Sequence, residues 1–267
     1  MTGYRVIADL HVHFYPFYNL EAAMRSAFQR LSILAGAKGP QKTIKIVGLA
    51  ERSDCHFFRD LKARTQAVKG FSVSDFPEDE NSLSIRADTQ GDELLLLAGR
   101  QIVTSERLEV VALTADMAPS DGQPVRTVLD QIRKSGAVPC INWAPGKWLG
   151  PRGKIIASLI RGGRPGDFVL GDTTLRPSLC GEPGLMREAR KKGFVVIAGS
   201  DPLPFAGEEN KPGVYGSLWE TEFDPAQPAE SLRKLLLTAP SPRLAGRRDS
   251  VSGVFRRLWK NRQAKRK

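Results

Sequence analysis

Histidine, cysteine and long apolar runs are all scarce in this chain, and each scarcity argues against a class of protein. The 267 residues include three histidines and three cysteines. Cys55, Cys140 and Cys180 are odd in number and far apart, which argues against a disulfide framework or a cysteine-based zinc site and fits a reducing cytosol. No apolar stretch approaches the roughly 20 residues that a membrane-spanning helix needs. Because the N-terminus is strand-like and has no charged-then-apolar leader, we expect a cytoplasmic protein.

Acidic residues are fewer than basic ones, and the difference is concentrated at the C-terminal end of the chain. The net charge is +11, and residues 246–267 hold nine lysines or arginines against one acid, Asp249. That segment carries +8 and leaves only +3 for the rest, so nucleic acid is not an expected partner of the body. The 41% hydrophobic content suffices for one large α/β domain or two small ones.

Apolar strand candidates alternate with amphipathic helix candidates. Strands are expected at residues 5–10, 43–49, 93–97, 101–103, 109–113, 138–143, 168–170 and 194–198, and helices at 20–34, 55–68, 125–134, 155–159, 185–192 and 230–237. The polar residues 70–91 are expected to form a long loop. The alternation predicts an α/β fold with a largely parallel sheet, open or closed into a barrel. In such folds, sites are built at the carboxyl ends of the strands.

Two of the three histidines lie in one motif at the end of the first predicted strand, Asp9-Leu10-His11-Val12-His13. Side chains alternate along a strand, so His11 and His13 point to the same side. Two imidazoles on one side can grip one metal ion. The alternative is a pair of histidines whose polar atoms are satisfied by neighbouring groups.

A second motif, Gly199-Ser200-Asp201, ends the apolar run 195–198. A carboxylate at this place can bind a metal ion and accept a proton from water. The two motifs resemble the first and last motifs of the polymerase and histidinol phosphatase (PHP) family, with Leu203 in place of the last histidine. The resemblance spans residues 4–206. It implies a distorted (β/α)7-type barrel with divalent metal at its C-terminal mouth and hydrolysis of phosphate esters.

Several positions where that family carries metal ligands hold other residues here. Arg52, Ala144 and Leu203 stand where histidines are expected, Gln101 where a bridging glutamate is expected, and Glu109 where a further histidine is expected. A neutral amide is a poor bridge between two cations. The resemblance therefore implies a reduced, mononuclear site.

The ligand set that remains is His11, His13, Glu51 and Asp201. It can hold one divalent ion, Zn, Mn or Fe. Asp201 and Glu51 are the expected catalytic residues. Glu51 stands where the family has aspartate, and its other interpretation is an ion pair with a nearby arginine.

Two further loops are candidates for substrate binding. Trp143 and Trp148 flank Lys147 after a predicted strand, and a lysine between aromatic walls suits an anionic or ring-bearing ligand. Arg176 follows another strand and could bind an anion. The alternatives are that the tryptophans pack under their loop and that Arg176 forms an ion pair.

The basic C-terminal segment reads as an amphipathic helix. Val251, Val254, Phe255, Leu258 and Trp259 recur at helical spacing, with arginines and a lysine on the other side. Such a helix can lie on an anionic membrane surface, which would make the protein peripheral to the membrane, or bind an acidic partner. It can equally pack its apolar side on the body.

The sequence thus predicts a PHP-like barrel domain over residues 1–240 and a basic tail or helix over residues 241–267. The expected function is that of a metal-dependent hydrolase, phosphoesterase-like, acting on a small anionic substrate. One alternative is an inactive barrel that serves as a binding or scaffold protein. The other is an amidohydrolase-like enzyme acting on a C–N bond, although no histidine follows His56.

Overall fold

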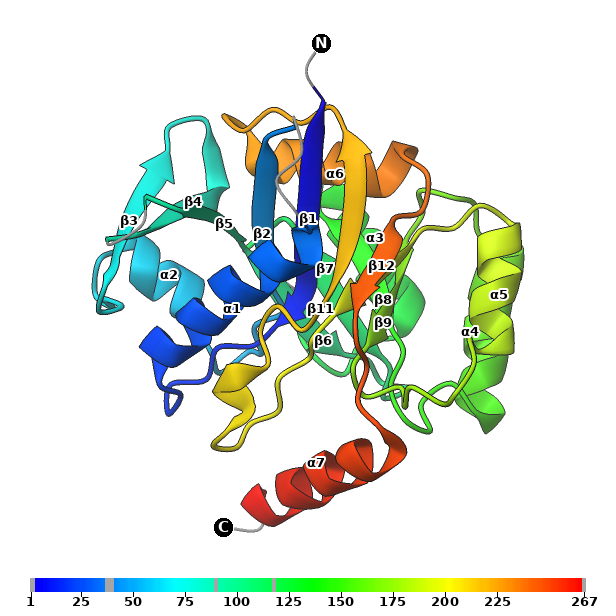
Figure 1. The fold of residues 1–267 in the computed structure, drawn as a ribbon. Coiled ribbons are helices and arrows are strands. Elements are labelled where there is room, and N and C mark those ends of the chain that lie inside the picture. The colour runs from blue at the N-terminus through cyan, green and yellow to red at the C-terminus, as the bar shows by residue number, and fades with distance from the viewer. Residues whose placement is uncertain (1–2, 37–40, 89–90, 117–118, 266–267) are drawn as a thin grey trace.

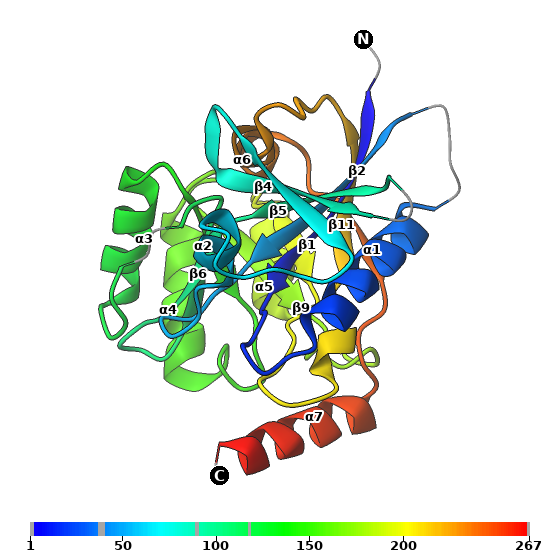
Figure 2. The same ribbon diagram turned by 90° about the vertical axis from the view of Figure 1, so that its left-hand side faces the viewer.

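The computed structural model describes residues 3–36, 41–88, 91–116 and 119–265, whose strands and helices are shown in Figures 1 and 2. The strands are β1 (Tyr4–Val12), β2 (Thr43–Leu49), β3 (Phe71–Phe76), β4 (Asp79–Ala87), β5 (Glu93–Leu97), β6 (Gly99–Val103), β7 (Glu109–Leu113), β8 (Val138–Asn142), β9 (Val169–Thr173), β10 (Val196–Gly199), β11 (Tyr215–Thr221) and β12 (Arg243–Gly246). The helices are α1 (Leu20–Ala35), α2 (Phe57–Lys62), α3 (Val125–Lys134), α4 (Gly150–Gly162), α5 (Gly184–Lys191), the 3-10 helix η1 (Glu208–Asn210), α6 (Pro228–Thr238) and α7 (Val251–Ala264). Within the described part of the chain, no helix has the length and apolar character needed to cross a membrane.

The strands form two sheets. The first has seven strands in the order β12-β11-β1-β2-β5-β4-β3, and the second has five in the order β10-β9-β8-β7-β6. Both are mixed, because β1 runs parallel to β2 but antiparallel to β11, and β8 runs parallel to β9 but antiparallel to β7. In the first sheet, the parallel strands β1 and β2 present their carboxyl ends at the same end of the molecule.

Apolar side chains fill three layers. One cluster packs α1 and α2 against β1, β2, β4 and β5, and a second packs α3, α4 and α5 against β6–β10. The third lies between the sheets, where Leu10 and Ile46 of the first sheet meet Val111 and Ile197 of the second, and α6 contributes Leu232. All of these side chains have almost no exposed area, which is the condition for a large hydrophobic stabilisation.

The predicted (β/α)7 barrel is wrong, although the α/β class holds. A strand has two edges, and β1 uses one for β2 and the other, over Tyr4–Ala8, for β11. No ladder among the described strands therefore joins β1 to β10 and closes a ring. The two sheets are held together instead by the apolar cluster that lies between them, and an isolated bridge joins Glu51 to Arg100.

Two other segments contain strands that the sequence patterns did not predict. Residues 70–91, expected as a loop, contain the antiparallel hairpin β3–β4, which extends one edge of the larger sheet. Near the C-terminus, β12 pairs with β11 before the chain continues into α7. The helix predicted in the basic segment is present as α7. The division of the chain into two parts at residue 240 stays a prediction.

Candidate metal site

Two histidines face each other where β1 ends. His11 and His13 are both buried, and their Nε2 atoms lie 3.1 Å apart. The carboxylate of Asp201 completes the group, because its Oδ1 atom lies 3.6 Å from Nε2 of His11 and 3.8 Å from Nε2 of His13. All three ligand atoms lie within 4.8 Å of one another. The structure thus brings the first and last sequence motifs together.

Asp201 reaches this place through a close approach of β10 to β1. A Cβ atom on Gly199 would lie 2.3 Å from Cβ of His11, so only glycine fits there. Just beyond, the backbone N–H of Asp201 donates to the carbonyl oxygen of His11 at 2.9 Å. Asp201 has a left-handed φ of 51°, which costs a residue with a side chain about 1–2 kcal/mol. Strain of this kind persists only where the surrounding structure fixes the residue.

The buried carboxylate of Asp9 ties three segments together beneath the histidines. Its oxygens accept hydrogen bonds from the backbone N–H groups of Ser200 and Gly213, both at 2.8 Å. Burial raises the pKa of Asp9 to about 6, and these hydrogen bonds oppose the rise. Asp9 therefore acts on the site by holding its backbone.

The geometry of the three side chains fits one metal ion. Ligand bonds of about 2.0–2.1 Å in tetrahedral geometry separate ligand atoms by about 3.4 Å, which the three observed distances bracket. Burial, with His11 and Arg52 nearby, lowers the pKa of His13 and keeps its imidazole neutral, the form that binds metals. Burial also raises the pKa of Asp201, so a cation here would offset the cost of its charge. The Nδ1 atoms of both histidines are buried and have no hydrogen-bond partner among the described residues.

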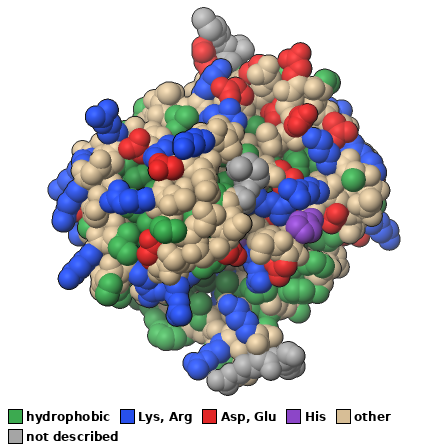
Figure 3. Space-filling model, turned by 180° about the vertical axis from the view of Figure 1, so that it is seen from behind, with side chains coloured by type: hydrophobic (Ala, Val, Ile, Leu, Met, Phe, Trp, Pro, Cys, Tyr) green, Lys and Arg blue, Asp and Glu red, His purple; other side chains and the backbone are tan. Residues whose placement is uncertain are grey.

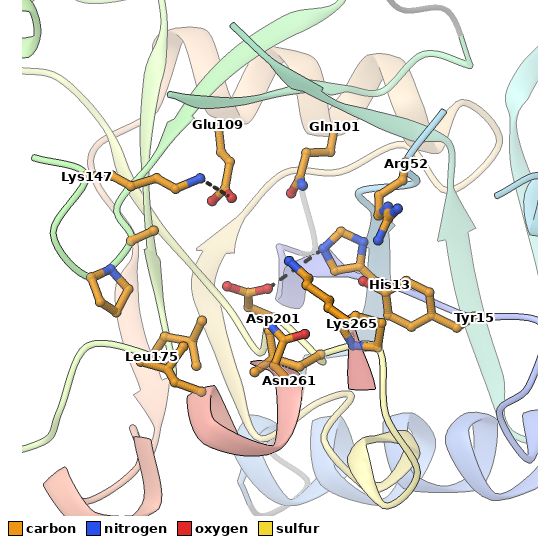
Figure 4. Close-up of a pocket in the computed structure, with 15 residues that line it drawn as sticks. His13, Tyr15, Arg52, Gln101, Glu109, Lys147, Leu175, Asp201, Asn261 and Lys265 are labelled. Atoms are coloured by element: carbon orange, nitrogen blue, oxygen red, sulfur yellow. Dashed lines mark hydrogen bonds and ion pairs between the residues drawn. The ribbon is translucent and has the colours of Figure 1, made fainter. Parts of the chain in front are cut away.

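A cavity of about 300 Å³ opens beside His13 and Asp201 (Figure 4). Its wall carries three basic side chains, Arg52, Lys147 and Lys265, against the carboxylates of Glu109 and Asp201. A divalent ion would raise this excess of positive charge further. The cavity is therefore suited to a small anionic ligand.

Five residues at positions where the PHP resemblance led us to expect metal ligands line this same cavity. They are Arg52, Gln101, Glu109, Ala144 and Leu203. The structure thus brings these five positions, which are far apart in sequence, to one cavity. Among these five side chains, Arg52 carries a guanidinium and Gln101 a neutral amide, neither of which is a good ligand for a divalent cation.

The three residues expected to bind substrate lie in different surroundings. Lys147 lines the cavity and forms an ion pair with Glu109. Trp143 is half-buried against the second apolar cluster and is not among the described residues that line the cavity. Arg176 is buried in a bidentate ion pair with Asp172, at 2.7 and 2.6 Å. Only Lys147 is placed to meet a ligand in this cavity.

Glu51 lies outside the group formed by the two histidines and Asp201. Its side chain is 1% exposed, and its carboxylate lies 3.9 Å from Nη1 of Arg100. Burial raises the pKa of Glu51 to about 7, while Arg100 and the backbone N–H groups that begin α2 oppose the rise. Neither carboxylate oxygen makes a well-formed hydrogen bond to a described residue. Its role as a ligand or helper stays a prediction.

Sequence patterns gave no sign that α7 belongs to the site. Leu258, Asn261 and Lys265 line the cavity, so the helix forms one of its walls. Charge and helical spacing could not separate these residues from their neighbours on the same helix. Only the path of the chain from β12 brings α7 below the strand ends (Figure 1).

Arg257 of α7 anchors the loop that carries Asp201. It is buried, and its Nη1 donates to Oγ1 of Thr174 at 2.7 Å. Its Nε donates to both carboxylate oxygens of Glu208, each at 3.0 Å. Glu208 also accepts a hydrogen bond from the backbone N–H of Leu203 at 3.0 Å, so the loop is held from both of its sides.

No protein-family model matches the chain, and no curated protein matches it either. Among solved structures it is similar to PsfC from Pseudomonas syringae PB-5123, with a TM-score of 0.60 and 13% identity over 98% of this chain and 99% of that one. It is also similar to the lesion-specific endonuclease PfuEndoQ from Pyrococcus furiosus, with a TM-score of 0.52 and 11% identity. That match covers 90% of this chain but only 57% of the endonuclease. At such identities the likeness concerns the fold alone.

Proposed function

We propose that this protein is a metal-dependent hydrolase that cleaves a phosphate ester in the cavity beside β1. The observation that carries the proposal is the meeting of His11, His13 and Asp201 at distances that suit a single ion. The fold likeness to an endonuclease supports a hydrolase in general terms. The PHP resemblance supports the finer assignment to phosphate esters.

The proposed site divides the work between one ion and the chain's own side chains. A divalent ion held by His11, His13 and Asp201 would supply a Lewis acid and activate water near neutral pH. Asp201 would hold the ion and accept a proton during attack, since a carboxylate beside a bound ion can take the proton of the ion's water. Lys147 and Lys265 would bind the charged oxygens of the substrate.

Arg52 stands in for a lost metal ligand in this proposal. It lines the cavity and also forms an ion pair with Asp54, at 3.0 Å. A guanidinium can bind two phosphate oxygens at once, so it can replace part of the charge of a second ion. Glu51, which lies outside the three-residue ligand group, would support the site through the backbone at the start of α2 or would bind the ion as a further ligand.

The test combines metal content with turnover. Protein purified without chelator should hold close to one Zn, Mn or Fe ion per chain, and His13→Ala should lose it. His56→Ala is the matched control, because His56 is exposed and lies outside the ligand group. Mono- and bis-(p-nitrophenyl) phosphate and a duplex oligonucleotide cover monoesters, simple diesters and nucleic acid.

Turnover that disappears in Asp201→Asn supports the hydrolase. Bound metal without turnover of any substrate would instead favour the alternative of a binding or scaffold protein. Protein without metal, unchanged by His13→Ala, would defeat the whole proposal.

A further inference from the structure

The helix α7 has two faces of different character. Val254 and Arg257 are buried against the body, as a helix that packs on a protein requires. Phe255 and Trp259 lie outside this buried face and are 71% and 62% exposed. The apolar side of the helix is therefore only partly covered by the body, because Val254 is buried while Phe255 and Trp259 stay exposed.

The outward face of α7 combines an apolar stripe with basic flanks. Val251, Phe255 and Trp259 are four residues apart, so they lie in one row along the helix. Arg256 and Arg262 are exposed beside that row. We call Val251, Phe255, Trp259, Arg256 and Arg262 the outer face. In Figure 3 basic side chains are seen on the helix at the bottom of the molecule.

Other exposed apolar side chains lie on loops at the same end of the molecule. Phe17 follows β1, Leu149 follows β8 and Leu179 follows β9, and they are 58%, 71% and 87% exposed. The loop of Leu179 is joined to the start of α7, because the backbone N–H of Ser178 donates to the carbonyl oxygen of Asp249 at 2.8 Å. Isolated exposed apolar residues are ordinary, so these loops add to the outer face only where they lie beside α7.

We propose that the outer face docks this protein on an anionic lipid surface, with Phe255 and Trp259 entering the headgroup region. An apolar row with cations on its flanks matches the boundary between acyl chains and anionic headgroups. The loops that carry Phe17, Leu149 and Leu179 can also insert into the bilayer, because a fluid surface adapts to scattered apolar contacts. The proposal does not depend on the proposed catalytic function.

The charge of this region argues against two other occupants. A second copy of the chain would bring two basic segments of +8 together, and like charges repel. Nucleic acid would match the cations but would leave the central apolar row without a favourable partner. An anionic bilayer satisfies both the cations and the apolar row.

Trp259 provides a direct probe. The other three tryptophans are buried or half-buried, so a change in emission on adding vesicles reports mainly on Trp259. Full-length protein is mixed with phosphatidylcholine vesicles with and without phosphatidylserine. We expect a blue shift and co-sedimentation only with phosphatidylserine, both weakened by salt.

Matched variants separate docking from general stickiness. Phe255→Ser and Trp259→Ser should each lower the partition coefficient about tenfold, the loss expected for one buried aromatic side chain. Ile33→Ser, which removes a side chain 74% exposed on α1, should leave it unchanged. Circular dichroism and melting temperature confirm that each variant is folded.

Equal binding to both vesicle types, or binding that survives Phe255→Ser and Trp259→Ser, overturns the proposal. So does a dimer in light scattering that Phe255→Ser dissolves, because the face would then bind a second copy. Binding to an oligonucleotide in the absence of binding to anionic vesicles would assign the outer face to nucleic acid and would equally overturn it.

Discussion

Nη2 of Arg257 donates a 2.7 Å hydrogen bond to the backbone carbonyl oxygen of Asp201. A residue of the basic C-terminal segment thereby fixes the backbone of a proposed metal ligand. Because Arg257 also pairs with buried Glu208, removing it would leave an uncompensated charge in the interior.

Arg257→Ala should destabilise the fold by about 3 kcal/mol, a typical cost of breaking a buried ion pair by removing one partner. It should also weaken metal binding, because Asp201 loses a support for its left-handed backbone. Urea unfolding and Zn²⁺ titration measure the two effects. Arg256→Ala, an exposed neighbour, is the control and should change neither. Metal affinity that stays constant in folded Arg257→Ala would show that Arg257 supports only the fold.

Removing the metal should lower the melting temperature of the wild-type protein. An ion that binds only the folded state adds about 2.7 kcal/mol when it is present at 100 times its dissociation constant. Chelator should therefore destabilise wild type and His56→Ala but not His13→Ala, in differential scanning calorimetry. An equal response of all three proteins would place the metal elsewhere.

Arg52→Ala should raise KM for the phosphate ester more than it lowers kcat. Its guanidinium lines the cavity and is not among the ligands of the proposed ion. Loss of a charge-assisted hydrogen bond costs about 1.5–3 kcal/mol, which corresponds to roughly 10- to 150-fold in kcat/KM. Arg52→Lys should recover part of it. A variant with unchanged KM would exclude Arg52 from substrate binding.

Glu51→Gln should stabilise the metal-free protein at high pH. Burial raises the pKa of Glu51 from 4.5 to about 7, so the folded state holds its proton more tightly than the unfolded state does. Relative to Glu51→Gln, wild type should therefore lose stability as the pH rises from 4.5 to 7 and then level off. The difference at pH 8 should be on the order of 3 kcal/mol by urea unfolding of chelator-treated protein. A difference that does not vary between pH 4.5 and 8 would contradict the raised pKa.

Local patterns predicted much of this molecule. The bounds of β2, β7 and α3 follow directly from apolar periodicity, and the two short motifs identified His11, His13 and Asp201. These features depend on neighbours in sequence. Strand alternation alone places both histidines on one side, and an apolar strand that ends in Gly-Ser-Asp places the carboxylate.

What the sequence concealed depends on distant partners. The β3–β4 hairpin carries serines and acids because it lies at a sheet edge, where a strand need not be apolar on both sides. The pairing of β11 with β1, which prevents the barrel, joins segments some two hundred residues apart. Arg257 looks like its neighbours until Glu208, distant in sequence, is placed beside it.

The contact between Gly199 and His11 has a consequence for how such a site can change by mutation. Any side chain at Gly199 would collide with His11, so this position tolerates no residue other than glycine. The wall of the cavity is different, because Arg52, Gln101 and Ala144 border its open volume, which leaves room for other side chains at these positions. The close contact between Gly199 and His11 fixes the backbone below the site, whereas the residues that line the cavity can differ. One backbone can therefore accept a different number of ions or a different ligand. Randomising Arg52, Gln101 and Ala144 while keeping Gly199 and His11 is therefore the natural design for altering specificity.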